Sequence, residues 1–340
     1  MAAAEAAERL MAAHGTATVV RRQYIDANQL AKMAWTLGRP SVSGVTVSDD
    51  AALPDGTPVP AGYHLAYFAP GGLEADLGPD GTDRTFNAPV PFTRRMWAGG
   101  RMEWTTNTVS GGCDGLRVGE VAEERTRLVS ATPKLSKSSG HGMVLVEVEK
   151  ELWTRRGLAV VDRRSWIFQP AVAPDTETPK SASILPGAPF LSYKGPSTVH
   201  DEMDSTRSTA ASGAASISEN ATDLVRHFCW SPVALFRFSA LTFNGHKIHY
   251  NEDWTQSVEK QNGLVVHGPL NLINLLNYWQ DATGNVTGPQ RIHYRALRPL
   301  YAGDTYQIRT RGKAAGDGPR PVWDVVVQKN GKDHMSAEIQ

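Results

Sequence analysis

Two cysteines in 340 residues exclude several classes of protein. Cys113 and Cys229 lie far apart, so they form neither a disulfide framework nor a zinc-binding pair, and we expect a reducing compartment. Net charge is also missing, because Lys and Arg together number 35 and so do Asp and Glu. Overall charge therefore gives the chain no attraction to nucleic acid or to an anionic membrane.

Long apolar runs are lacking as well. No run approaches the roughly 20 residues that a bilayer-spanning helix needs. The alanine-rich residues 2–13 lack the basic start and long apolar core of a secretory signal, and they are typical of a short helix or frayed tail. A mitochondrial presequence would hold more Arg and Ser and less acid, but this alternative stays open. We expect a cytoplasmic or mitochondrial protein with no membrane span.

A segment poor in apolar residues divides the chain. Residues 171–222 are dominated by Ser, Thr, Ala and Pro, which are too polar to build a core. We interpret them as a linker that is partly ordered at PFLSY (189–193) and flexible beyond it. The linker separates an N-terminal domain, residues 1–170, from a C-terminal domain, residues 223–340, called here the first and second halves.

The two halves share a short pattern. LRVGEVAEERTRL (116–128) and LYAGDTYQIRTRG (300–312) each place a glycine and an acid before alternating apolar residues, which is typical of half-buried antiparallel strands. The corresponding residues are Leu116, Gly119 and Glu120 in the first half and Leu300, Gly303 and Asp304 in the second. Glycine permits the positive φ that such a turn needs. A duplicated strand-rich domain is one interpretation, and a chance match is the other.

Two segments have helical patterns. The first begins with Asp26 as a candidate N-cap and ends at Gly38. The second, residues 267–281, begins with His267, Gly268 and Pro269 and is apolar except for a stripe of three asparagines. A helix that is apolar on nearly all sides is buried, which predicts a sheet wrapped around a helix and an α+β fold.

The segment FNGHKIHY (243–250) holds the most chemistry. It places Asn244, His246 and His249 within six residues. In isolation, two histidines three residues apart are more often surface or satisfied core residues than catalytic groups. A metal site is disfavoured, because no Asp, Glu or Cys nearby completes a ligand set.

Several segments resemble the MaoC-like, double hot-dog acyl-thioester hydratases and dehydratases. The resemblance is to the branch of hydroxyacyl-thioester dehydratases type 2 and mesaconyl-C4-CoA hydratases. It rests on PVPFTRRMWAGGRMEW (89–104), LFRFSALTFNGHKIHYN (235–251), LVVHGPL (264–270) and YRALRPLYAGD (294–304), and more loosely on PAGYHLAYF (60–68). It implies a double hot-dog fold, with two curved antiparallel sheets each wrapped on a long helix.

The resemblance also implies roles for individual residues. The general motif carries an acid, an asparagine and a histidine where this chain has Asn244, His246 and His249. His249 would transfer the proton, since an imidazole near neutrality can take up or deliver one, and His246 would assist. Asn244 would hold water or the β-hydroxyl, because an amide takes up no proton. Gly268 would supply the N–H that binds the negative charge on the thioester oxygen.

The predicted substrate-binding residues are Phe243, Lys247, His267, Trp97, Arg237 and Arg298. His267 has an alternative in simple packing against the helix, and Trp97 lies in RRMWAGG, which is also compatible with a structural turn. The cations are candidates for the phosphates of coenzyme A, although most surface cations are merely solvated. We expect no cofactor and no metal, and a homodimer is compatible with the sequence.

Two functions from different classes stay open. The leading one is a hydro-lyase that adds or removes water across the α,β bond of an acyl thioester of CoA or acyl carrier protein, with the first half supplying the acyl pocket. The other is a hot-dog dehydratase, cyclase or binding protein that acts on a free small molecule or polyketide intermediate. A thioesterase is disfavoured, because no carboxylate is evident in FNGHKIHY.

Overall fold

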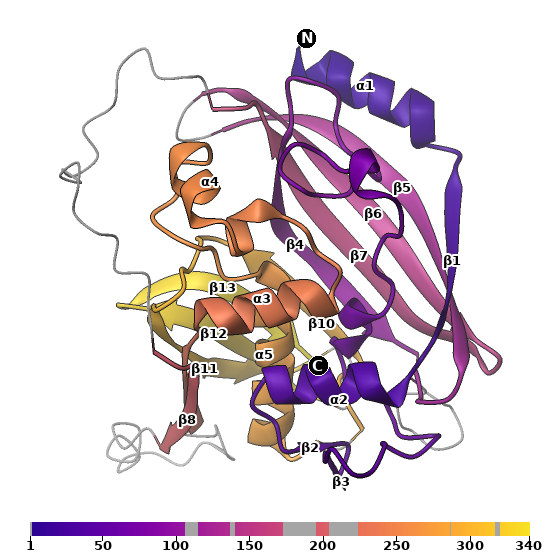
Figure 1. Ribbon diagram of the computed structural model, residues 1–340, viewed down its shortest axis with the longest axis vertical. Helices are drawn as coiled ribbons and strands as arrows, with labels where there is room; N and C mark the ends of the chain where they lie inside the picture. Colours follow the sequence, from indigo (N-terminus) through magenta and orange to yellow (C-terminus); the bar gives the residue numbers. More distant parts are fainter. Residues whose placement is uncertain are drawn as a thin grey trace.

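One continuous antiparallel sheet of 11 strands runs through the part of the chain that the structure describes (Figure 1). This computed structural model describes residues 2–105, 115–136, 140–172, 195–203, 224–285, 287–316 and 320–340. All strand pairs in this sheet are antiparallel. The prediction of an α+β protein with antiparallel strands is therefore confirmed.

The first half contributes five strands to this sheet. They are β1 (Thr18–Tyr24), β4 (Arg94–Trp104), β5 (Val121–Leu135), β6 (Gly142–Thr154) and β7 (Gly157–Gln169). Its helices and turns are α1 (Ala3–His14), α2 (Ala27–Thr36), η1 (Tyr63–Ala66) and η2 (Glu74–Asp76). A small separate hairpin consists of β2 (Ser41–Val42) and β3 (Val45–Thr46).

The remaining strands of the sheet lie beyond the first half. They are β8 (Thr198–Met203), β9 (Leu224–Cys229), β10 (Arg291–Ala296), β11 (Thr305–Ala314), β12 (Val322–Lys329) and β13 (Lys332–Ile339). The helices and turn of the second half are α3 (Pro232–Leu241), η3 (Lys247–His249), α4 (Glu252–Ser257) and α5 (Gly268–Thr283).

Both halves arrange their strands in the same order. The sheet runs β1-β5-β6-β7-β4 through the first half and β10-β13-β12-β11-β9-β8 through the rest. Apart from β8, each half places its first strand in chain order at the outside, then its third, fourth and fifth, and its second strand at the centre. The central strands β4 and β10 pair with each other, which joins the halves into one sheet.

The turns that precede β5 and β11 show the same duplication in detail. Gly119 and Gly303 have φ angles of 87° and 84°. Their N–H groups donate to Ile25 O and Trp230 O, both at 2.9 Å. These positive φ angles are the ones that glycine adopts without strain, so the short sequence pattern marks a real structural repeat.

The helices that follow these contacts are also related. Asp26 caps α2 by accepting from Gln29 N at 2.8 Å, and Ser231 caps α3 by accepting from Ala234 N at 3.2 Å. Helices α2 and α3 lie side by side (Figure 1). The Gln29 side chain donates to Leu241 O at 2.8 Å, so a hydrogen bond joins the helical layers of the two halves.

Two parts of the expected architecture are wrong. The strands form one sheet rather than two separate ones, because β4 and β10 pair across the middle. Among the described residues, only the second half has a long helix between its first two strands: α5, with 16 residues. The place equivalent to its start in the first half holds η1, a turn of four residues. This turn is buried, and His64 and Leu65 line the cavity described below.

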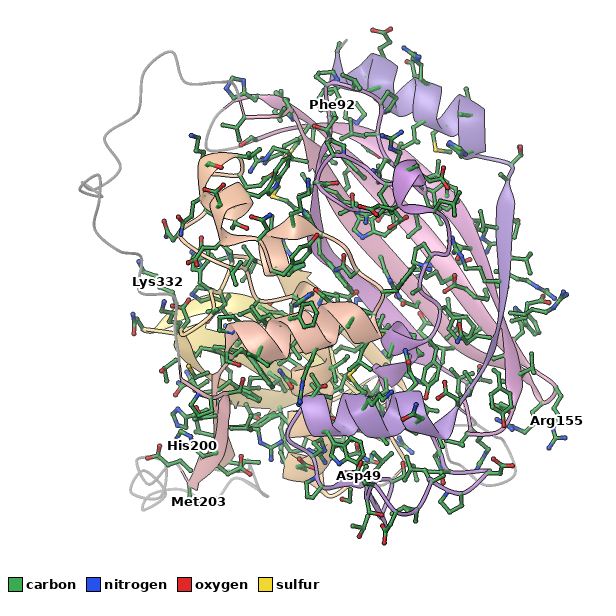
Figure 2. The ribbon with its side chains drawn as sticks, viewed as in Figure 1. Asp49, Phe92, Arg155, His200, Met203 and Lys332 are labelled. Carbon is green, nitrogen blue, oxygen red and sulfur yellow. The ribbon has the colours of Figure 1, made fainter. Side chains whose placement is uncertain are left out.

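Two apolar clusters lie on the inner face of the sheet. The larger surrounds α5, whose three asparagines are buried together with its leucines. The smaller lies under α1, where Ala6, Ala7 and Leu10 pack near Phe92 (Figure 2). The N-terminal segment is thus a packed helix and not a frayed tail.

The segment between the halves is described only in part. Residues 173–194 and 204–223 lie outside the described residues, and so does the predicted order at 189–193. Between them, β8 pairs with β9 at the edge of the sheet, where His200 and Met203 lie (Figure 2). The domain boundaries themselves stay a prediction. In the described ranges, no helix is long and apolar enough to span a membrane.

Candidate active site

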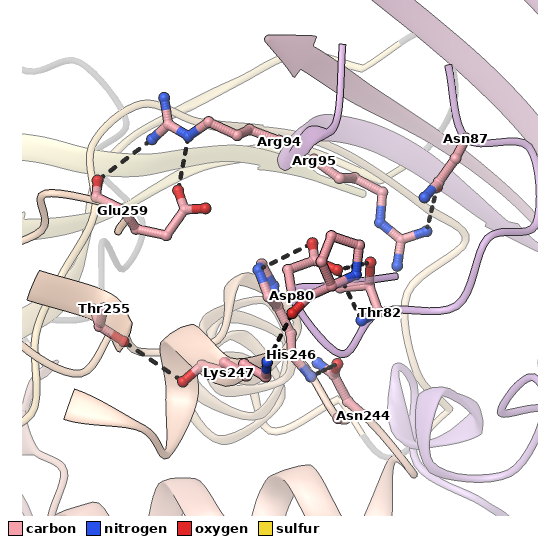
Figure 3. Close-up of polar contacts among 12 residues, drawn as sticks. Asp80, Thr82, Asn87, Arg94, Arg95, Asn244, His246, Lys247, Thr255 and Glu259 are labelled. Atoms are coloured by element: carbon pink, nitrogen blue, oxygen red, sulfur yellow. Dashed lines mark hydrogen bonds and ion pairs between the residues drawn. The ribbon is translucent and has the colours of Figure 1, made fainter. Parts of the chain in front are cut away.

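The segment FNGHKIHY (243–250), called here the histidine loop, follows α3 and is fixed by short backbone hydrogen bonds. Asn244 N donates to Ser239 O at 2.8 Å, which ends the helix. The Asn244 side-chain oxygen accepts His246 N–H at 3.1 Å, so this amide stabilises the turn that leads into η3 (Figure 3). Its amide nitrogen is then the part of Asn244 that has N–H groups for a substrate.

His249 is held in one tautomer by the backbone. Its ring is 6% exposed, and Nδ1 lies 2.7 Å from Val265 O. A carbonyl oxygen only accepts hydrogen bonds, so Nδ1 carries the proton of the neutral ring. Nε2 therefore has a free lone pair, which is what a general base requires.

Three histidines pack together here. The rings of His249 and His267 stack with centroids 3.6 Å apart, and the rings of His249 and His246 meet edge to face at 5.4 Å. Burial lowers the pKa of His249 to about 3, and the neighbouring His246 adds to this effect. Burial and the charge of Arg95 lower the pKa of His246 to about 3. All three rings are consequently neutral near pH 7, because burial likewise lowers the pKa of His267.

His267 supports His249 from the start of α5, and its predicted contact with substrate stays a prediction. It is fully buried at the start of α5, and its Nε2 lies 2.9 Å from Ser239 Oγ. Its Nδ1 has no hydrogen-bond partner among the described residues. The ring covers the back of His249 and fixes the plane of that imidazole.

A carboxylate missed by the sequence analysis lies at this site. Asp80, from the turn before β4, has Oδ2 3.7 Å from His246 Nε2 (Figure 3). Its Oδ1 accepts from Thr82 N at 3.0 Å and from Thr82 Oγ1 at 2.8 Å. Asp80 is 7% exposed, so the first half places a buried acid beside a histidine of the second half.

The turn of residues 79–82, called here the Asp80 turn, packs directly on the histidine loop. Lys247 N donates to Asp80 O at 2.8 Å, and Lys247 Nζ donates to Pro79 O at 2.7 Å. Gly81 has φ 82°, and a Cβ there would lie 2.1 Å from Gly245 O. Lys247 therefore joins the two halves, and its predicted contact with substrate stays a prediction. Only the Pro-Asp-Gly turn signal was visible in the sequence, and it does not reveal this distant contact.

Gly268 and Trp97 form another contact between the halves. Gly268 is the first residue of α5, so its N–H has no partner inside the helix. The Trp97 side chain lies 3.6 Å from where a Gly268 Cβ would be. Trp97 belongs to β4, where the pairing with β7 shifts register between Trp97 and Gly99. The RRMWAGG segment is thus a bulged strand and not a turn.

The two arginines of that segment are already engaged. Arg94 donates to the Glu259 carboxylate at 2.7 Å (Figure 3), and Arg95 donates to Asp83 at 2.9 Å. Arg95 also lies over the Trp166 ring at 5.0 Å. Both line the site, but their charges are partly neutralised.

A cavity of about 900 Å³ connects these groups. Most of the predicted site residues line this cavity: Trp97, Phe243, Asn244, His246, His249, Gly268 and Arg298. Lys247, His267 and the exposed Arg237 lie outside its wall. Phe236 and Phe243 are 60% and 69% exposed, so the cavity opens to solvent. Within the described ranges, no three His, Cys, Asp or Glu side chains are grouped to hold a metal ion.

Comparisons with known proteins identify the family of the chain. The family model for hydroxyacyl-thioester dehydratase type 2 matches residues 62–190 and 197–302. Mesaconyl-C(4)-CoA hydratase of Chloroflexus aurantiacus is 27% identical over 264 residues, 77% of each chain. The mitochondrial hydroxyacyl-thioester dehydratase type 2 of Schizosaccharomyces pombe is 23% identical over 302 residues, 86% of this chain and 90% of that protein.

A solved MaoC-like dehydratase has a similar fold. It aligns with a TM-score of 0.62 at 12% identity, over 97% of this chain and 98% of that one. At this identity the likeness concerns the fold alone. The two segments matched by the family model contain the Asp80 turn and the histidine loop respectively.

Proposed function

We propose a mechanism for this chain, which belongs to the hydroxyacyl-thioester dehydratase type 2 family. It is a hydro-lyase that adds or removes water across the α,β bond of an acyl thioester. The reaction requires a proton transfer at the α-carbon and stabilisation of the negative charge that develops on the thioester oxygen.

His249 is the acid–base group of the proposed mechanism. In dehydration its Nε2 takes a proton from the α-carbon, the β C–O bond breaks, and His249 returns the proton to the departing hydroxyl as water. Hydration follows the same steps in reverse. The hydrogen bond from His249 Nδ1 to Val265 O carries this proposal, because it leaves Nε2 as the free base.

Gly268 stabilises the charge that develops on the substrate. The proton leaves more easily when the thioester oxygen accepts a hydrogen bond from Gly268 N–H at the positive end of α5. Trp97 covers this helix end from β4 and excludes water from it. Both halves therefore contribute to one reaction site.

In the proposed mechanism, Asp80 and Asn244 together take the roles that the acid has in the general motif. Asn244 orders the loop and offers its amide N–H groups to the β-hydroxyl. Asp80 orients His246 through the contact of 3.7 Å between its Oδ2 and His246 Nε2. His246 in turn holds the hydroxyl or water near His249, which explains why an acid is dispensable at position 244.

The shared strand order supports a double hot-dog architecture with a single site. The Asn-x-His-x-x-His arrangement occurs in the second half and has no counterpart in residues 1–170. The first half would have kept the fold and lost the catalytic loop.

The open cavity favours a carrier-bound substrate over the free small molecule. A thioester needs an opening through which the pantetheine arm reaches the surface, and Phe236 and Phe243 mark such an opening. Arg298 also lines the cavity and is exposed, so it is a candidate contact for the carrier phosphates. A relative named for a CoA thioester favours CoA as the carrier. A homodimer and a cytoplasmic or mitochondrial location stay predictions, and one relative is named mitochondrial.

The test is direct assay with thioesters. Crotonyl-CoA, mesaconyl-CoA and 3-hydroxyacyl thioesters are incubated with the protein, and the enoyl absorbance is followed in both directions. Turnover that saturates with substrate supports the proposal. Absence of turnover with all of them, in a folded protein, would overturn it in favour of the free small molecule.

A further inference from the structure

A row of ionisable side chains crosses the inner face of the sheet in the first half. They come from η1 and from β1, β5, β6 and β7, which are neighbours in the sheet (Figure 1). We call these residues the polar belt: Arg21, His64, Glu124, Lys150, Asp162 and Arg164.

The polar belt is a set of ion pairs and hydrogen bonds around two carboxylates. Lys150 Nζ donates to Glu124 at 2.9 Å, and Arg21 donates to the same carboxylate at 3.2 Å. Arg164 Nε donates to Asp162 at 2.8 Å. The His64 ring also contacts Asp162, with Nε2 3.3 Å from Oδ2. Each cation of the belt therefore already has a carboxylate partner within it.

The polar belt separates the two apolar clusters. Side chains two or four residues apart on a strand share a face, so apolar neighbours mark the edges of the belt. These neighbours are Ala122 and Leu128 on β5, Leu152 and Val148 on β6, and Val160 and Phe168 on β7. One member of each pair belongs to the larger cluster and the other to the smaller. The belt therefore occupies the place where a continuous apolar core would otherwise run.

Burial makes this arrangement costly. Glu124 is 1% exposed, His64 4%, Lys150 7% and Asp162 0%. Buried ion pairs repay their desolvation poorly, and apolar side chains in their place are often neutral or stabilising. Packing alone gives no reason to keep charges here, which points to a role in binding.

The polar belt faces the cavity that contains the reaction site. Every member except Asp162 lines this cavity, and so do His249 and Gly268. The Trp97 side chain packs on Gly268, and the Arg164 guanidinium lies 5.5 Å from the Trp97 ring. An acyl chain whose thioester lies at Gly268 therefore reaches the belt once it has passed Trp97.

Two cations of the belt have N–H groups to spare for a ligand. An ammonium group has three N–H donors and a guanidinium group has five. Among the described residues, Lys150 Nζ donates to Glu124, and Arg164 donates through Nε and Nη2 to Asp162. Because the charges of both are already paired, the remaining N–H groups suit an oxygen that accepts a hydrogen bond without adding a charge.

A plain alkyl chain is a poor match for this surface. The cavity of about 900 Å³ has room for a long acyl chain, so volume does not exclude one. An alkyl chain against the belt would take water from the N–H groups of Lys150 and Arg164 and give no hydrogen bond in return. Displacing water in this way lowers affinity.

We infer that the polar belt selects acyl thioesters whose chain carries an uncharged oxygen, a hydroxyl or keto group, at its distal end. This oxygen accepts hydrogen bonds from Lys150 and Arg164 while the thioester lies at His249 and Gly268. Alkyl chains that are long enough to reach the belt are poor substrates. The inference rests on the proposed function and specifies its substrate.

The experiment uses pairs of thioesters that differ only in one hydroxyl group. 2-Butenoyl-, 2-hexenoyl- and 2-octenoyl-CoA are each compared with the analogue that has a hydroxyl on its last carbon. For native protein, we expect kcat/KM to fall along the alkyl series. We expect a preference of about 10–100-fold for the hydroxyl analogue in the pair that reaches the belt, as is usual for a hydrogen bond to a charged group.

Lys150→Met tests the belt itself. Glu124 keeps Arg21 and the Thr126 hydroxyl as donors in this variant, so no carboxylate is left without a partner. The variant should lose most of the preference for the hydroxyl analogue and should turn over 2-octenoyl-CoA faster than native protein does. A gain with one substrate is not the result of a damaged fold. Lys150→Arg, which keeps the donor, should keep most of the preference.

The matched control is the double variant Arg22→Met, Glu123→Gln. It removes an ion pair of 2.7 Å on the opposite face of β1 and β5, outside the cavity wall. It should leave the preference unchanged. The inference is overturned if native protein prefers no hydroxyl analogue at any chain length, or if Lys150→Met keeps the native preference.

Failure of the proposed function gives a different result. Absence of turnover with all of these thioesters would count against the hydro-lyase mechanism itself. Calorimetric titration with the same pairs then decides the inference. Tighter binding of a hydroxyl analogue that Lys150→Met abolishes supports the polar belt as a site for an uncharged oxygen, and equal binding within every pair contradicts it.

Discussion

The carboxylate of Asp80 in the first half lies 3.7 Å from Nε2 of His246 in the second half. In the proposed mechanism, this contact takes the place of the acid that the general hydratase motif carries at the position of Asn244. The reaction site therefore depends on docking of the Asp80 turn, as well as on the histidine loop.

Asp80→Asn should lower kcat by about 10–100-fold, because an amide orients His246 more weakly than a charge-assisted contact does. Asp80→Glu should recover part of the rate. Steady-state hydration kinetics over a range of pH measure both effects. The control is Asp76→Asn, which changes a carboxylate in η2 that accepts Leu73 N–H at 3.1 Å and does not itself line the cavity. Equal rates for native protein and Asp80→Asn would remove Asp80 from the mechanism.

Gly81→Ala should lower both stability and turnover. The added Cβ would lie 2.1 Å from Gly245 O, so the Asp80 turn must move away from the histidine loop. Gly56→Ala is the matched control, since Gly56 has a similar φ of 84° and open space around its Cβ. Both variants carry backbone strain of about 1–3 kcal/mol. Urea unfolding and kcat should separate them, and equal losses in the two would show that the contact with Gly245 is unimportant.

Asn244→Ala should be more harmful than Asn244→Asp. The Asn244 oxygen accepts His246 N–H at 3.1 Å, and an Asp carboxylate can accept the same bond. Alanine removes this bond and the amide donor together, with an expected loss in kcat/KM of about 10-fold or more. Kinetics of both variants, with thermal unfolding as the check on folding, decide the order. An Asp variant as poor as the Ala variant would mean that the loop turn is not the main role of this side chain.

The buried histidines should make the protein sensitive to acid. Burial holds the pKa of His246 and His249 at about 3, and it is about 6.5 in an unfolded chain. Between these values the unfolded chain binds more protons, so stability is full above about pH 6.5 and is lost as the pH falls toward about 3. Urea unfolding across this window should show a steeper loss for native protein than for His249→Gln, which has no titrating ring. Parallel curves would contradict the buried, neutral state of His249.

The same pKa values bear on the rate. A base limb near pH 6.5, shifted by burial, is the expectation from the sequence. Because the pKa of His249 is about 3, the base is already unprotonated at pH values well below the physiological one. Its protonation therefore does not limit the rate near neutral pH. The acid end of the activity profile should therefore follow unfolding rather than titration of His249.

Local patterns in the sequence predicted much of the second half. The asparagine-striped helix is α5, and the Gly-acid turns before β5 and β11 are the same turn twice. The predicted catalytic residues Asn244, His246, His249 and Gly268 all line one cavity, although their catalytic roles stay proposals. These features are local, since capping, turn chemistry and periodicity act over a few residues.

The features that sequence did not predict are contacts between distant residues. Asp80 meets His246 across 166 positions, and no periodicity links them. The buried charges Glu124 and Asp162 lie in EERTR and VDRRS, which have the alternation of ordinary strands, and such a pattern does not reveal which face is inward. The pairing of β4 with β10 joins the strands of the two repeats into one sheet. It is made by backbone N–H and C=O groups at the strand edges, so the side-chain pattern does not predict it.

Turnover of acyl thioesters by His249→Ala tests the central claim most directly. Native protein and the variant are assayed with crotonyl-CoA and mesaconyl-CoA by loss of enoyl absorbance, and circular dichroism verifies that both are folded. The account predicts that the variant loses about 10²–10⁴-fold in kcat, the usual contribution of a positioned general base, while His246→Ala loses less. Near-native turnover in a folded His249→Ala protein would contradict it.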